Sequence, residues 1–141
     1  LSREYVYYIH QCKNPFLQET SFFFPYKLDL QLMHEAAALI KEGSNFFAFS
    51  KTNTQVNNYA CVIYKSELSL KDDILTFNIE GNRFLRGMVR AITATLLKIG
   101  RQKISIDEFQ QLLQGDARAA VSVPAHALFL QRVRYSDQYF K

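Results

Sequence analysis

The chain has 141 residues, of which 48% are apolar and 21% charged; 17 Lys and Arg against 13 Asp and Glu give a formal net charge of +4. This composition excludes a disordered or polyelectrolyte chain, and the length predicts one domain with a sizeable core. No run approaches the roughly 20 apolar residues of a membrane helix. Two cysteines make no disulfide framework, so we expect a cytoplasmic protein without a membrane partner.

The first third of the chain predicts a strand, a helix and a turn. Residues 3–10 (REYVYYIH) are rich in Tyr, Val and Ile, which is typical of a strand. Asp29 is a good N-cap for a helix over residues 30–42, and Gly43 ends this helix. The three Phe of residues 45–50 (NFFAFS) indicate a buried loop or a single turn.

Two strands and a long helix follow. Residues 59–68 and 74–80 predict strands, and in the second strand Leu, Phe and Ile alternate with polar residues, so one face is buried. After a break at Gly81, residues 83–99 carry apolar side chains at helical spacing, and Gly100 ends this predicted helix.

Two shorter elements complete the chain. Residues 105–108 (SIDE) form a capping box that opens a helix ending at Gly115, and residues 128–135 predict the last strand. The order strand–helix–strand–strand–helix–helix–strand predicts an α+β fold, with helices packed on one face of a mainly antiparallel sheet. We expect residues 1–141 to form one domain.

Three arginines distinguish the predicted long helix from an ordinary surface helix. On a helical wheel, Arg83, Arg86 and Arg90 fall within about 60° of one another, opposite the apolar arc. This helix contains no acidic residue. Gly87 lies on the arginine side, and its cost of about 1 kcal/mol relative to Ala favours the close approach of another group. The charges predict an anion partner, a phosphate or a carboxylate from elsewhere, although a solvated basic face is the alternative.

Several segments resemble the tRNA pseudouridine synthase A family. Residues 77–90 (FNIEGNRFLRGMVR) are similar to its F-L/V-x-x-M-V-R strand-to-helix signature. Residues 3–7 resemble its R-x-Y-x-Y strand, residues 45–49 its D-F-x-x-F turn, and residues 127–135 its closing G-L-x-L-x-x-V-x-Y strand, with Ala127 in place of Gly. The family's catalytic motif, A-G-R-T-D-x-G-V-H-A, does not occur here. The resemblance therefore implies a C-terminal half, whose catalytic Asp lies in an N-terminal half outside this chain.

The resemblance implies an isomerase that converts uridine to pseudouridine in the tRNA anticodon stem-loop, at tRNA positions 38–40. It implies no metal or organic cofactor. The implied partners are tRNA, the enzyme's own N-terminal half and a second copy in a homodimer. Arg90 matches the arginine that pairs with the catalytic Asp, Tyr5 the tyrosine that packs on the target base, and Leu128 the leucine that lines the uracil pocket. Arg83 and Arg86 are candidate phosphate contacts, and the chain alone is expected to be inactive.

The residues by themselves leave two other functions open. One is a non-catalytic RNA-binding or scaffolding module, and the other is an interaction domain whose arginines meet a protein carboxylate. Tyr5 and Leu128 would then be ordinary core residues. A start codon at Leu1 favours these alternatives, whereas an Arg-Thr-Asp motif about one domain upstream favours the synthase.

Overall fold

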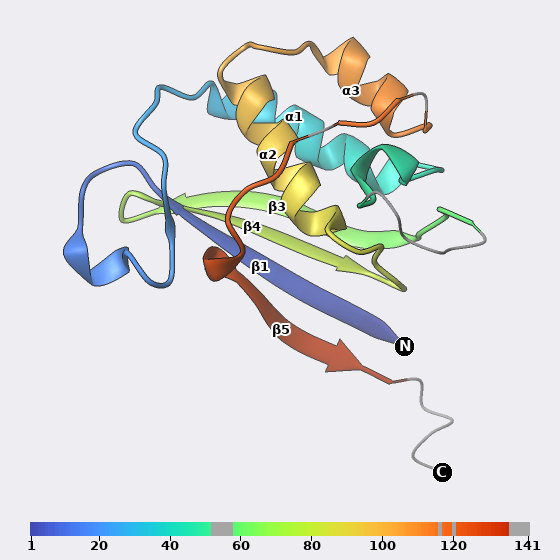
Figure 1. Cartoon of the computed structure of the whole chain (residues 1–141), viewed down its shortest axis with the longest axis horizontal. Helices are drawn as coiled ribbons and strands as arrows, with labels where there is room; N and C mark the ends of the chain where they lie inside the picture. Colours follow the sequence, from blue (N-terminus) through green and yellow to red (C-terminus); the bar gives the residue numbers. More distant parts are fainter. Residues whose placement is uncertain (52–57, 116, 120, 136–141) are drawn as a thin grey trace.

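The computed structural model describes residues 1–51, 58–115, 117–119 and 121–135. In this part of the chain, a five-stranded sheet carries helices on one face, which confirms the predicted α+β fold (Figure 1). The strands are β1 (Ser2–His10), β2 (Phe22–Phe23), β3 (Ile63–Lys71), β4 (Ile74–Gly81) and β5 (Leu128–Arg134). The helices are α1 (Leu30–Leu39), α2 (Met88–Gly100) and α3 (Ile106–Leu112), with 3-10 turns η1 (Pro15–Leu17), η2 (Ile40–Glu42), η3 (Phe47–Phe49) and η4 (Ala125–Ala127).

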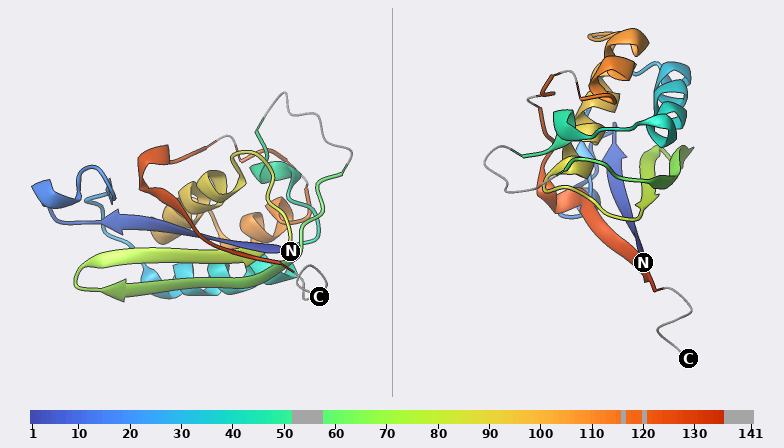
Figure 2. Two further views of the ribbon diagram at one scale, coloured as in Figure 1. Left: turned by 90° about the horizontal axis from the view of Figure 1, so that it is seen from below. Right: turned by 90° about the vertical axis from the view of Figure 1, so that its right-hand side faces the viewer.

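Strand β1 is the centre of the sheet. It pairs antiparallel with β4 along nearly its whole length, and β3 pairs antiparallel with β4 beyond it. The other edge of β1 pairs antiparallel with β5 and, at its last two residues, parallel with β2. Figure 2 shows the N-terminus beside the end of β5, where Ser2 lies opposite Arg134. The sheet is mainly antiparallel, as predicted, but the short parallel strand β2 was not expected.

Local sequence signals set the starts of two helices as predicted. Asp29 caps α1 by accepting a hydrogen bond from the Leu32 amide at 3.1 Å. Ser105 and Glu108 complete the capping box of α3. The segment predicted to be a buried turn contains η3, whose Phe49 is buried. These signals act within one helical turn, which is why the sequence reveals them.

The core lies between the helices and the sheet. On β4, the alternating residues Leu75, Phe77 and Ile79 are buried, which confirms the predicted pattern. Nearly every residue of α2 is buried, because this helix lies over the sheet and contacts α1 (Figure 1). In the described part of the chain, none of the helices has the length and apolarity that crossing a membrane requires.

Strand β3 begins four residues later and ends three residues later than the predicted strand 59–68. Asp72 and Asp73 both have positive φ angles, 52° and 63°, as in the two-residue turns that match the twist of paired strands. Pairing with β4 therefore continues up to the turn. At the other end, the Val62 amide donates to Asn82 Oδ1 at 2.8 Å, so the ladder starts after this residue.

The prediction that the long helix begins at Arg83 is wrong. Helix α2 begins at Met88, and Gly87 before it has a φ angle of 75°, a left-handed conformation that Gly adopts without strain. Residues 83–87 are a loop, so the three arginines do not share one helix face. The positive φ angle explains why a glycine stands at position 87, so this residue does not indicate the close approach of another group.

The replacement Gly87→Ala tests whether position 87 lies before the helix, because the change in the free energy of unfolding should differ in sign between the two cases. Inside a helix, Ala would stabilise the chain by about 1 kcal/mol. With a positive φ, Ala should instead lower the free energy of unfolding by about 1 kcal/mol. The nearest atom to a Cβ added at position 87 is Lys51 Cβ, at 3.6 Å. The change in stability therefore reports the backbone conformation and not a steric clash.

Urea unfolding of the chain measures this difference. The matched control is Ala38→Gly, since Ala38 is exposed within α1. This replacement should be destabilising because Gly disfavours a regular helix, where Ala is preferred. A gain of stability in Gly87→Ala would contradict the observed backbone conformation.

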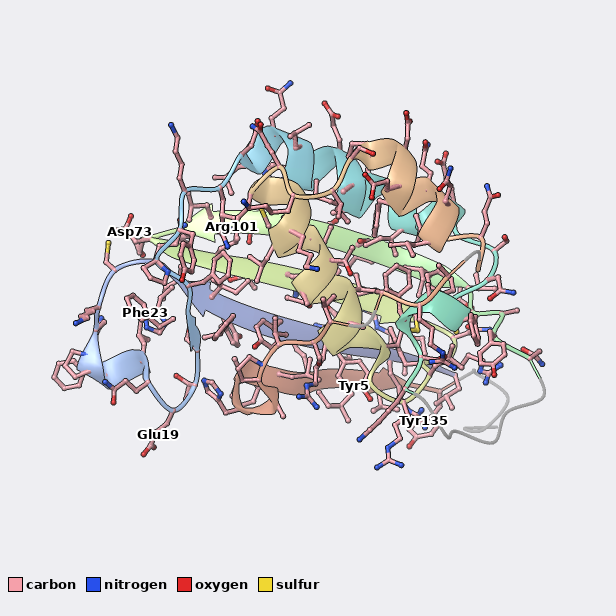
Figure 3. The ribbon with its side chains drawn as sticks, turned by 45° about the horizontal axis from the view of Figure 1, so that its top comes forward. Tyr5, Glu19, Phe23, Asp73, Arg101 and Tyr135 are labelled. Carbon is pink, nitrogen blue, oxygen red and sulfur yellow. The ribbon has the colours of Figure 1, made fainter. Side chains whose placement is uncertain are left out.

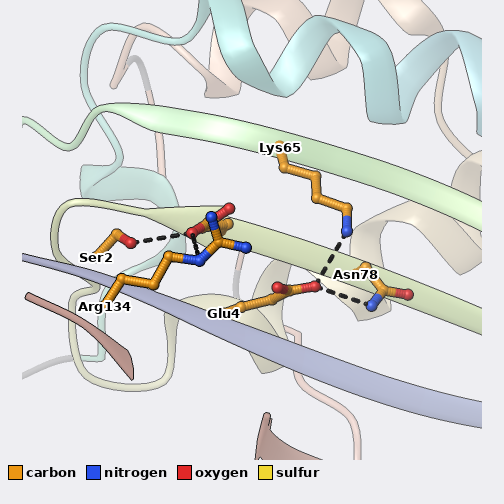
Figure 4. Close-up of polar contacts among 6 residues, drawn as sticks. Ser2, Glu4, Lys65, Asn78 and Arg134 are labelled. Atoms are coloured by element: carbon orange, nitrogen blue, oxygen red, sulfur yellow. Dashed lines mark hydrogen bonds and ion pairs between the residues drawn. The ribbon is translucent and has the colours of Figure 1, made fainter. Parts of the chain in front are cut away.

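The sheet face away from the helices carries two ionic contacts. Glu4 on β1 is only 2% exposed and accepts hydrogen bonds from Lys65 Nζ and Asn78 Nδ2, both at 3.2 Å (Figure 4). Nearby, Arg134 Nε lies 3.5 Å from a carboxylate oxygen of Glu80. Burial acts to raise the pKa of Glu4, but the Lys65 and Asn78 hydrogen bonds and the neighbouring positive charges leave the pKa below its ordinary value.

This lowered pKa predicts a pH-dependent contribution to stability. A carboxylate with a depressed folded-state pKa stabilises the protein fully above its ordinary pKa of 4.5, and the effect is lost as pH falls through the folded-state value. We expect Glu4→Gln to lower the Tm at pH 7 and to have little effect near pH 2. An equal loss at both pH values would contradict the electrostatic role. Glu67→Gln on the exposed part of β3 is the control.

Candidate active site

A segment that joins α3 to β5 crosses beside α2, and we call its residues 121–127 the strap (Figure 1). Arg90 Nε on α2 donates a hydrogen bond to the Val123 carbonyl at 2.8 Å. The hydroxyl of Tyr7, which is fully buried on β1, donates to the Pro124 carbonyl at 2.7 Å. Helix α2 and strand β1 therefore each donate a hydrogen bond to one of two consecutive carbonyl groups of the strap. These two bonds position the strap, and with it Leu128 at the start of β5.

The phenol of Tyr7 is suited to this donor role. Burial raises the pKa of Tyr7 above its ordinary range, although the positive charge of Arg90 acts in the opposite direction. The hydroxyl therefore keeps its proton at neutral pH and remains a donor to the strap.

A cavity of about 260 Å³, the first cavity, lies where β1, β5 and the start of α2 meet. Tyr5 from β1, Arg90 from the first turn of α2 and Leu128 from the start of β5 all line it. Figure 3 shows Tyr5 near the N-terminal end of α2. All three side chains are partly exposed. The structure thus brings together the three residues that the family resemblance singled out, from three distant parts of the chain.

The ring of Tyr5 is oriented by an aromatic neighbour. Phe84, in the loop before α2, makes an edge-to-face contact with Tyr5, with ring centroids 5.0 Å apart and planes at 83°. Such a contact contributes about 0.5–1.5 kcal/mol beyond the area it buries. Phe84 also lines the first cavity, so it fixes one edge of the Tyr5 ring while the cavity remains open beside it.

Arg90 is fixed at only one of its nitrogens. Its Nε contacts the strap, whereas its two Nη groups make no hydrogen bond with any residue that the structure describes. Among the same residues, no carboxylate lies within 4.0 Å of this guanidinium. The side chain therefore presents a positive charge and four N–H donors to the cavities that it lines.

The two other predicted arginines differ in position. Arg86 is exposed and lines the first cavity. Arg83 does not line it; instead, its Nη1 donates to Asn58 Oδ1 at 2.8 Å and to the Ala60 carbonyl at 3.3 Å. The structure therefore brings Arg86 into the site and ties Arg83 to the segment before β3.

The sequence alone does not indicate that Phe84 contacts Tyr5, nor does it reveal the strap. The Tyr7 hydrogen bond joins residues 117 positions apart, and no local pattern reveals such a contact. In the part of the chain that the structure describes, no three His, Cys, Asp or Glu side chains are arranged to hold a metal ion. The first cavity combines the aromatic ring of Tyr5, the apolar side chain of Leu128 and the positive charge of Arg90.

Comparison with known proteins gives consistent matches. Residues 37–136 match a family described as tRNA pseudouridine synthase. The tRNA pseudouridine synthase A of Parabacteroides distasonis is 40% identical over 141 residues, which cover 99% of this chain and 56% of the relative. The proteins of the same name from Bacteroides fragilis and a Geobacillus species are 40% and 34% identical, over 99% and 96% of this chain and 57% and 56% of the relatives. The chain thus spans a little over half the length of these relatives.

Proposed function

Because the chain belongs to the tRNA pseudouridine synthase family, we propose that it forms the C-terminal half of an enzyme that converts uridine to pseudouridine in tRNA. The reaction detaches uracil from the ribose, turns the base and rejoins it through carbon instead of nitrogen. The observation that carries the proposal is the single cavity lined by Tyr5, Arg90 and Leu128. The catalytic Asp comes from the N-terminal half of the enzyme.

Arg90 is proposed to pair with this Asp. A carboxylate in a closed pocket stays ionised only beside a permanent cation, which a guanidinium supplies at any physiological pH. The two open Nη groups of Arg90 match the two oxygens of a carboxylate. The bond from Nε to the strap fixes the guanidinium before the second half contributes the acid, so Arg90 is a positioning residue for the catalytic group.

Tyr5 and Leu128 are proposed to hold the flipped uracil. Stacking of a base on an aromatic ring contributes about 1–3 kcal/mol and offsets part of the few kcal/mol that flipping costs. The contact with Phe84 keeps the Tyr5 ring oriented, so the base meets a rigid surface. Leu128 forms an apolar wall that excludes water from the reacting base.

The further partners in this proposal rest on the family resemblance. The target uridines lie in the anticodon stem-loop, at tRNA positions 38–40, and the complete enzyme is a homodimer in the cytoplasm. Arg86 and Arg83 contact RNA phosphates. Arg86 is the better placed of the two, because it is exposed beside the first cavity and Arg83 already binds the segment at residues 58–60.

The isolated chain should not convert uridine in tRNA, because the attacking carboxylate is missing. Pseudouridine formation displaces the hydrogen at carbon 5 of uracil, so release of tritium from labelled tRNA measures it. We expect no release with the chain alone and release with the complete enzyme. Turnover by the chain alone would contradict the proposed division of the active site.

In the complete enzyme, Arg90→Ala should lower kcat by roughly 100-fold to several thousand-fold. Unpairing a buried charge pair costs about 3–5 kcal/mol, and each 1.36 kcal/mol is tenfold in rate. Arg90→Lys keeps the charge but loses the planar fork, so its loss should be smaller.

Arg101→Ala is the control for this experiment. Arg101 follows the far end of α2, where its guanidinium lies 4.2 Å from the centre of the Tyr26 ring, and its removal should leave turnover close to wild type. Melting curves show whether each variant is folded. Near-normal kinetics in a folded Arg90→Ala enzyme would refute the assigned role.

A further inference from the structure

A second cavity, of about 380 Å³, shares Gly87 and Arg90 with the first cavity. It lies between the η3 turn, the first turn of α2, Arg118 and the start of the strap. Its lining comprises Ala48, Phe49, Ser50, Lys51, Gly87, Arg90, Ala91, Arg118, Val121 and Ser122. Neither the predicted uracil contacts nor the predicted phosphate contacts include the residues that are specific to this cavity.

Arg118 is held rigidly at the second cavity. Its Nη1 donates to the Ser50 carbonyl at 2.7 Å and lies 3.5 Å from the Ser50 hydroxyl, and its guanidinium carbon stands 4.2 Å from the centre of the Phe47 ring. A guanidinium has five N–H donors. The Nε and Nη2 groups of Arg118 make no hydrogen bond with any residue that the structure describes. The guanidinium of Arg118 is therefore held in one orientation, and its Nε and Nη2 groups can donate hydrogen bonds to a ligand.

Two guanidinium groups line the second cavity, and no acidic side chain is among the described residues that line it. Within residues 1–51, 58–115, 117–119 and 121–135, neither Arg90 nor Arg118 has an acidic oxygen within 4.0 Å. Lys51 adds a third cationic side chain to the lining. Buried apolar residues beside these groups, including Phe49 and Ala91, reduce the screening of their charge by water. The first turn of α2 also lies here, and its positive dipole end favours an anion.

We infer that the second cavity binds a backbone phosphate of the RNA strand beside the flipped uridine. This inference rests on the proposed function, since it takes the base to occupy the first cavity. Because Arg90 lines both cavities, a base held in the first leaves its own strand within a nucleotide's length of the second. Phosphate oxygens match the planar fork of arginine, and every nucleotide supplies a phosphate. A carboxylate from the other half of the enzyme is less favoured, because Arg90 already receives that group in the first cavity.

The test compares Arg118→Gln with Arg101→Gln in the complete enzyme. Both arginines lie 4.2 Å from an aromatic ring centre, and both replacements remove one positive charge, but Arg101 is beyond the opposite end of α2. We expect Arg118→Gln to weaken tRNA binding about tenfold or more. It should also reduce the slope of log affinity against log salt by about 0.7–0.9, the share of one phosphate contact. Arg101→Gln should change neither quantity.

A second variant covers the case in which Arg118→Gln is destabilised by the loss of its bond to Ser50. Ser122 is exposed at the rim, and Ser122→Glu introduces a carboxylate into the cavity without removing either guanidinium. It should weaken tRNA binding and reduce the salt slope in the same way. Wild-type affinity and slope in a folded Ser122→Glu enzyme would overturn the inference.

Two more results would overturn the inference. One is a lower Tm of Arg118→Gln with unchanged tRNA affinity, which would mean that Arg118 serves the fold or meets a protein carboxylate. The other is an equal loss of binding in Arg118→Gln and Arg101→Gln, which would mean that only total charge matters. Failure of the proposed function looks different: wild-type enzyme would bind tRNA but release no tritium.

Discussion

The carbonyl groups of Val123 and Pro124 determine where the strap lies. One accepts a hydrogen bond from Arg90 on α2, and the other accepts one from the buried hydroxyl of Tyr7 on β1. The acceptors belong to one segment and the donors to two separate elements, so both bonds form only when helix and sheet are correctly packed. Leu128 then enters the sheet opposite Tyr7, and its side chain lines the first cavity together with Tyr5 and Arg90.

The parts of the fold that depend on neighbouring residues were predictable from the sequence. Asp29 and Ser105 cap helices through contacts within one turn, and the alternation along β4 reflects a single buried face. The start of α2 was placed too early for a physical reason. Leu85 packs into the core from a loop as well as it would from a helix. The helical spacing of apolar residues therefore continues across Gly87, although the helix itself does not.

In the candidate site, too, the contacts that join distant parts of the chain could not be predicted from the sequence. Tyr5, Arg90 and Leu128 were identified by their resemblance to family motifs, and no periodicity in the sequence indicates that they line one cavity. Arg118 carried no signal at all, because its position is defined by Ser50, which lies 68 residues earlier. Arg90 lines both cavities, so in the proposed function it connects the cavity that would hold the base with the cavity that would hold a phosphate. On that proposal, a single guanidinium would lie beside both the base and the phosphate of the bound strand.

The attachment of the strap through carbonyl oxygens affects how this region can evolve. Every amino acid carries a main-chain carbonyl, so an exchange at position 124, whose side chain is exposed, keeps the acceptor in place. The donors are not interchangeable in this way, since a buried phenol and a guanidinium have few substitutes. We therefore expect exchanges along the outer surface of the strap to be tolerated better than exchanges of Tyr7 or Arg90.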